Sequence, residues 1–354
     1  MTTVGGDTYT SDWYSFILLC VAADFGVNDG GRAVGDKGER QAAFLNFLGL
    51  QDPAVIDREG VYYSRDFESP DGASVKIIFL DTRFHRDTHY VRSLGELHFP
   101  FTALISAFIR LSLATLGIGR DHDGDVLGVH QWIWLESLLR GSTADVHVVV
   151  SSIQVATSNP VVESWGHFPK AKKRLLEIFQ KYDPSGLLLI SGDVHHGEVS
   201  SIPYLRAGGT VGQWYEITSS GLTHSCRDSK LTEYICPIML HTFNAHRDAI
   251  NNFLMERNFG LLSISAIGVP VENGLRYRAV VNATVSSLES SRRLEQIIHT
   301  SAERGSPITQ IHDVSFSHVF ESDVFSSRLC LSLFWAFLAG IVLYRMFPRH
   351  RGSR

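Results

Sequence analysis

The residues that could do chemistry gather in one short segment, LLLISGDVHHGE, from Leu187 to Glu198. A continuous apolar run leads directly into Gly192, and Asp193 and His195 follow with one residue between them. In an extended chain this spacing places a carboxylate and an imidazole on the same side, a ligand pair that suits iron, zinc or manganese. An isolated Asp-x-His pair also occurs in ordinary hydrogen-bonded loops. Because a strand precedes this pair and glycines flank it, we predict that Asp193 and His195 are metal ligands.

The elements that must position this segment are strands and helices in alternation. Apolar runs typical of strands buried on both faces occupy Val75–Leu80, Val146–Ser151 and Leu187–Ser191. Between them, His130–Leu139 and Lys170–Tyr182 repeat apolar residues at helical spacing. This order predicts an α/β domain with its site at the carboxyl end of a strand. Short strands of a second sheet, packed on the first, are predicted at Val211–Thr218, Leu261–Ala266 and Tyr277–Ala283.

Several segments resemble, in the same order, the motifs of the PhoD-like phosphatases, a family of the calcineurin-like metallophosphoesterase superfamily. SGDVHHGE, from Ser191 to Glu198, is similar to the last metal motif of that family. The other matching segments are DFGVNDGG (Asp24–Gly31), GVYYS (Gly60–Ser64), FLDTR (Phe79–Arg83), LGVHQWIWLE (Leu127–Glu136), SSIQV (Ser151–Val155), ESWGHFP (Glu163–Pro169), EITSSGLTHS (Glu216–Ser225) and RNFG (Arg257–Gly260). Their shared order over residues 24–265 is far more specific than any one segment.

The resemblance implies a fold, an activity and a set of site residues. The fold would be α/β, a metallophosphoesterase-like two-sheet sandwich flanked by helices, with a metal centre at its rim. The activity would be metal-dependent hydrolysis of phosphomonoesters or phosphodiesters, with divalent or trivalent Fe, Ca, Zn, Mn or Mg ions. Asp193 and His195 would bind metal, and His195 and His196 would be catalytic. The side chains that would line the substrate site are Asp24, Asn28, Arg83, Gln154 and His224.

Structural alternatives and one departure limit what the resemblance implies. Asn28 could simply make a turn, Arg83 could pair with Asp81, and His224 could only satisfy its own loop. Where the family has Trp-Asp-Asp-His, this chain has Cys-Val-Ala-Ala at residues 20–23, and the family's earlier Gly-Asp-x-x-Tyr segment has no counterpart. The chain thus resembles an N-terminally truncated member, expected to bind metal weakly and turn over slowly. The alternative is a catalytically dead, membrane-anchored relative that acts as a binding protein.

The C-terminal segment predicts membrane attachment. Residues 329–347 are almost entirely apolar, and roughly 17–25 such residues suffice for a helix that spans a bilayer. Basic residues follow and acidic ones precede the run, which places the tail in the cytoplasm and the main domain in a lumen or outside the cell. The alternative is a buried helix at the domain's end. A glycosylation sequon at Asn282 fits the lumenal orientation, in which Cys226 and Cys236 either pair or stay reduced.

Composition and one further segment complete the expected organisation. The net charge of −5 provides no basic field, so nucleic-acid binding is not expected. The apolar insertion Phe99–Gly119 contains Arg110, which would be costly inside a bilayer. We predict a helix there that caps the domain, lies on a membrane surface or packs in the core. The expected divisions are a divergent segment 1–23, a phosphatase domain 24–325 that is incomplete at its N-terminal side, a transmembrane helix 326–347 and a basic tail 348–354.

Overall fold

The computed structural model describes residues 30–68, 73–91, 102–205, 211–271, 274–300, 328–329 and 332. The strands are β1 (Tyr63–Glu68), β2 (Ser74–Phe79), β3 (Val146–Val150), β4 (Leu187–Ser191), β5 (Gly197–Leu205), β6 (Val211–Ser219), β7 (Phe253–Leu254), β8 (Asn258–Val271), β9 (Gly274–Ser287) and β10 (Arg293–His299). The helices are α2 (Lys37–Leu48), α3 (Pro53–Ile56), α4 (Thr102–Thr115), α5 (Gly128–Leu139), α6 (Pro169–Tyr182) and α7 (Lys230–Thr242), with a 3₁₀ turn at Trp165–His167.

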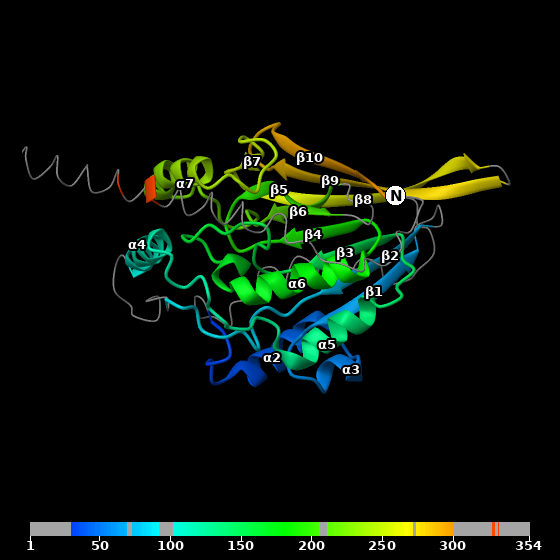
Figure 1. Ribbon diagram of the computed structural model, residues 1–354, viewed down its shortest axis with the longest axis horizontal. Coiled ribbons are helices and arrows are strands. Elements are labelled where there is room, and N and C mark those ends of the chain that lie inside the picture. Colours follow the sequence, from blue (N-terminus) through cyan, green and yellow to red (C-terminus); the bar gives the residue numbers. More distant parts are fainter. Residues whose placement is uncertain are drawn as a thin grey trace, which may run out of the picture.

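A seven-stranded sheet forms the centre of the molecule, in the order β1-β2-β3-β4-β6-β5-β7 (Figure 1). Its middle strands β2, β3, β4 and β6 run parallel, whereas the pairs toward both edges are antiparallel. Every residue of β3 and β4 is buried, which confirms the strands predicted from the two continuous apolar runs. The fold is therefore a mixed α/β fold in which helices flank a large sheet.

Two layers cover the central sheet. On one face, Leu135 of α5 and Leu175 of α6 share a hydrophobic cluster with Leu189 of β4, so these helices form one layer. On the other face, Leu188 of β4 belongs to a second cluster together with Val281 of β9. This second layer is the three-stranded sheet, in the order β10-β9-β8. The two layers cover the faces of the sheet. The loops that hold the candidate site extend from the carboxyl ends of its parallel strands.

The second sheet differs in membership from the sequence-based expectation. Leu261–Ala266 and Tyr277–Ala283 do lie in it, within strands β8 and β9 of 14 residues each. Val211–Thr218 does not, because it forms β6 and pairs in parallel with β4 in the central sheet. An apolar pattern shows that a segment suits a strand, but the neighbouring strand is chosen by long-range packing.

The apolar insertion forms helix α4, which begins at Thr102. Arg110 is only 8% exposed, and its guanidinium donates to the carbonyl of Val91 over 3.3–3.4 Å. Within the described residues, none of the helices combines the length and apolarity needed to cross a bilayer. The predicted span 329–347 lies outside the described residues except for Leu329 and Ser332, as do the segments 1–23 and 348–354.

Candidate functional site

A strained turn carries the predicted metal ligands between β4 and β5. Asp193 has a φ of 76° and His195 a φ of 58°, so two non-glycine residues adopt the left-handed region. Such conformations cost free energy and persist where surrounding contacts impose them, often at functional sites. Here the amide of His195 donates to the Ser220 hydroxyl over 3.2 Å. The carbonyl of His195 accepts from the amide of Cys226 at 3.1 Å. The segment after β6 therefore holds the turn in place.

The turn presents its ligands outward and beside a second histidine. His195 is exposed and Asp193 partly so. The His195 and His224 rings stack with 5.9 Å between centroids. His224 is also exposed, and its Nδ1 lies 3.0 Å from the Thr223 hydroxyl. The structure thus brings together three of the predicted site residues, Asp193, His195 and His224.

The metal site is not complete among the described residues. A catalytic metal usually has three protein ligands and an open position, whereas the described part of the chain contains no group of three or more His, Cys, Asp or Glu side chains placed to hold an ion. Asp24 and Asn28 lie outside the described residues. By themselves, the described side chains therefore do not fit a catalytic metal ion, although Asp193 and His195 could supply one side of its ligand shell.

Arg83 lies beside the turn in a buried ion-pair cluster. Its Nη1 donates to Glu163 Oε1 over 2.6 Å, and its Nη2 lies 3.4 Å from Asp193 Oδ1. Arg86 contacts the same oxygen of Glu163. Asp81, the nearby carboxylate, accepts the backbone amides of Arg83 and Phe84 at its Oδ1 over 2.8 and 2.9 Å. Arg83 therefore links Asp193 to Glu163, which belongs to a matching segment but was not among the predicted site residues.

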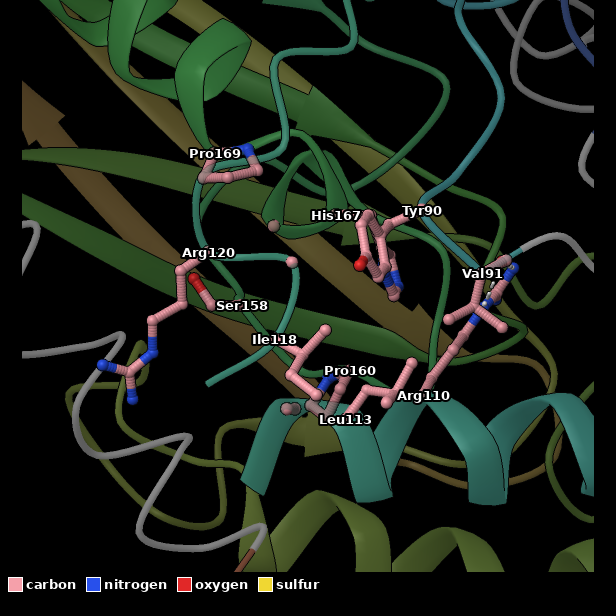
Figure 2. A pocket seen from close by; sticks show the side chains of 13 residues that line it. Tyr90, Val91, Arg110, Leu113, Ile118, Arg120, Ser158, Pro160, His167 and Pro169 are labelled. Carbon is pink, nitrogen blue, oxygen red and sulfur yellow. Dashed lines mark hydrogen bonds between the residues drawn. The ribbon is translucent and has the colours of Figure 1, made fainter. Parts of the chain in front are cut away.

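Positive charge extends from this cluster toward a pocket under α4. Burial, reinforced by the charges of Arg86, His167, Arg110 and Arg83, lowers the pKa of His89 well below its usual value. His89 is therefore neutral at pH 7. The His89 ring contacts His167, with 5.2 Å between centroids. His167 lines the pocket together with Tyr90 and Arg110 (Figure 2), so the pocket adjoins the Arg83–Glu163 cluster and shares its cationic surroundings.

Two other predicted site residues turn into the protein, toward Glu198. His196 is 1% exposed, and its Nε2 lies 3.0 Å from Glu198 Oε2. The Gln154 amide donates to the same oxygen over 2.9 Å. His246 and Arg247 reach the other oxygen, Oε1, at 2.6 and 3.0 Å. The geometry favours a positioning role for His196 and Gln154, because both are buried behind the turn that carries His195; a direct catalytic role for His196 stays a prediction.

The charge state of Glu198 follows from its partners. Burial by itself raises the pKa of a carboxyl, but the charge of His246 and hydrogen bonds from His196 and His246 outweigh it. The pKa of Glu198 consequently lies well below its usual range, and the side chain is an anion. Sequence reasoning missed its partners His246 and Arg247, since no local pattern connects residues 48 positions apart.

A disulfide ties the site to helix α7. Cys226 and Cys236 are bonded, which selects one of the two states that the sequence left open. Cys226 also donates its amide to His195, and Cys236 belongs to the buried face of α7. The covalent bond therefore connects α7 to the segment that supports the metal-ligand turn.

Comparisons with known proteins identify the family. A family model described as PhoD-like phosphatase matches residues 37–264, which is well over half of the chain. No curated protein matches the chain. Among solved structures, the structure of PhoD is similar with 13% sequence identity and a TM-score of 0.41. The alignment covers 85% of this chain and 58% of that one, so this chain spans less than two thirds of its length.

Proposed function

Because the chain belongs to the PhoD-like phosphatase family, we propose that it hydrolyses phosphomonoesters or phosphodiesters with the help of bound metal ions. The observation that supports the proposal is the turn after β4, where Asp193 and His195 both have positive φ and Asp193 contacts Arg83. Strain of this kind, at the carboxyl end of a parallel strand, is typical of a functional site.

The chain's own side chains divide the work in the following way. Asp193 and His195 would supply two metal ligands, and the remaining ligands would come from residues outside those described, of which Asp24 is the candidate. When bound, the metal would polarise a phosphoryl oxygen and make a bound water more acidic. Arg83 fixes Asp193, and Glu163 fixes Arg83 in turn. The neighbouring cations Arg86 and Arg110 add positive potential that favours a phosphate group near this edge of the sheet.

A metal-dependence assay tests this proposal. The purified chain is incubated with an aryl phosphate monoester and an aryl phosphate diester, with Mn²⁺, Zn²⁺, Ca²⁺ or Fe³⁺ and with a chelator. We expect slow hydrolysis of at least one of the two esters. An added metal ion should raise the rate of this hydrolysis, and the chelator should abolish it. Binding of metal and phosphate without any hydrolysis would instead favour the binding-protein alternative. Hydrolysis that is unchanged by chelation would contradict metal dependence.

We also propose that the phosphatase domain lies in a lumen or outside the cell, anchored by residues 329–347. The disulfide between Cys226 and Cys236 supports an oxidising compartment. The position of Asn282 supports a lumenal or extracellular domain as well. Its neighbours in β9, Val281 and Ala283, are buried on the core side of the strand. The Asn282 side chain therefore projects from the opposite face of the outer sheet, where its amide donates to Glu295 over 2.8 Å. A glycan attached there would point away from the core.

Glycosylation of Asn282 gives the topology a direct test. We expect chain synthesised with microsomes to run faster on a gel after glycosidase treatment, because the sequon would enter the lumen. Asn282→Gln should abolish the change. Thr284→Ser is the matched control, since it alters the same sequon but keeps the required hydroxyl, and it should retain the change. This topology would be contradicted if the wild-type chain stayed unglycosylated and protease digested it in intact microsomes.

A further inference from the structure

Helix α4 buries several polar side chains and exposes several apolar ones. Its buried residues include Ser106, Arg110 and Thr115, each at most 8% exposed. Phe108 and Ile109 are 36% and 37% exposed, although apolar residues of a surface helix normally face the core. The inward polar face is explained by Arg110, which binds the Val91 carbonyl and lines the pocket. Among the described residues, the exposed Ile105, Phe108 and Ile109 belong to neither hydrophobic core cluster.

Helix α7 exposes a second apolar face at the same end of the molecule (Figure 1). Tyr234 and Ile238, one helical turn apart, are 74% and 65% exposed, and Leu231 is 52% exposed. Cys236 and Leu240 form the buried side of the helix, and the disulfide fixes its rotation. The exposed apolar residues at this end, which we call the apolar end face, are Ile105, Phe108, Ile109, Leu116, Ile118, Leu231, Tyr234, Ile235 and Ile238.

The course of the chain indicates what this face contacts. Arg328 donates from its Nε to the carbonyl of Thr115, the last residue of α4, over 3.2 Å. Leu329 follows immediately, is 50% exposed, and begins the apolar run 329–347, which is long enough to enter a bilayer. The chain therefore starts this run beside the apolar end face. Exposed cations at the same end, Lys230 and Arg328, suit phosphate headgroups.

We propose that the apolar end face, formed by α4 and α7, docks on the surface of a lipid bilayer. Apolar side chains of both helices then enter the boundary between headgroups and acyl chains, while the buried polar face of α4 keeps Arg110 directed to the pocket. The pocket under α4 thereby opens close to the membrane surface. The proposal concerns the surface of the domain and holds independently of whether the chain hydrolyses phosphoesters.

Photo-crosslinking in vesicles tests the docking. Benzoylphenylalanine replaces Phe108, Tyr234 or Ile133 in the full-length chain, which is reconstituted in vesicles of equal parts phosphatidylcholine and phosphatidylserine. Ile133 is the matched control, because it is a 61% exposed apolar residue on α5, away from the apolar end face. We expect several-fold more lipid adducts from positions 108 and 234 than from position 133. In the position-234 protein, Phe108→Ser should lower the lipid adducts, whereas Val129→Ser on α5 should leave them unchanged.

Each remaining outcome overturns the proposal. Equal lipid labelling at the three positions would mean that the domain does not present this face to the bilayer. Adducts that join two protein chains would assign the face to self-association. Adducts within one chain, located by mass spectrometry in residues 301–354, would show that the chain covers its own apolar end face.

Discussion

The His195→Ala variant is expected to lose metal-dependent phosphoester hydrolysis, with its rate falling to that of the chelated wild-type chain. His195 supplies one of the two candidate ligands among the described residues, so its removal leaves a single one. Loss of an outer-shell partner already weakens metal binding or activity by about 10–100-fold, and loss of a ligand should reach at least the upper end of that range. Metal affinity is measured by titration with Mn²⁺, and hydrolysis with the aryl phosphate esters.

Stability separates this effect from misfolding. His195 is exposed, but its φ of 58° suits histidine better than alanine. Its truncation should therefore change the free energy of unfolding by about 1 kcal/mol. The matched control is His130→Ala, an exposed histidine of α5, which should keep both metal affinity and hydrolysis. A His195→Ala protein with undiminished metal affinity and turnover would remove His195 from the site.

The Glu198→Ala variant is expected to lower the free energy of unfolding by about 3–5 kcal/mol, the usual cost of removing one member of a buried ion pair. Glu198 is 1% exposed and accepts hydrogen bonds from His196, His246 and Gln154. Without it, the cation Arg247 stays buried beside two histidines. Urea unfolding followed by circular dichroism measures the change, and Glu289→Ala in an exposed loop serves as the control.

The pH dependence of this loss follows from the lowered pKa of Glu198. The folded-state pKa lies below the ordinary value of 4.5, so the stabilisation is present above that value and is lost as the pH falls through the folded-state pKa. Wild type and Glu198→Ala should therefore differ most near neutral pH and converge in acid. A difference that is the same at every pH, or below about 0.5 kcal/mol at pH 7, would show that the anion does not organise this region.

The Glu198→Gln variant separates the charge of Glu198 from its hydrogen bonds. Glutamine keeps the size of the side chain and one oxygen acceptor but removes the charge that His246 and Arg247 face. We expect a destabilisation smaller than that of the alanine variant, because part of the hydrogen bonding survives. A loss of metal affinity in this variant, without unfolding, would show that Glu198 positions the turn that carries His195.

The sequence by itself determined the local features of this protein. β4 has the predicted bounds, Leu187–Ser191, because a short apolar run followed by glycine specifies a buried strand and its end. The ordered motifs from Asp24 to Ser265 identified the family whose model matches residues 37–264. Asp193 and His195 were predicted as metal ligands from their spacing, the preceding strand and the flanking glycines, all within one segment, and both lie in one turn of the structure.

Only the tertiary structure decided which distant residues meet. Arg83 pairs with Glu163, 80 positions away, and Glu198 meets His246 across 48 positions. In the same way β6 joins the central sheet, and α4 buries Arg110 while Phe108 and Ile109 stay exposed. The physical reason is that each outcome depends on parts of the chain that are distant in sequence. A buried charge is stable only beside a partner, and a strand pairs with the sheet edge that packing leaves open. Neither the partner nor the edge is encoded within one stretch of chain.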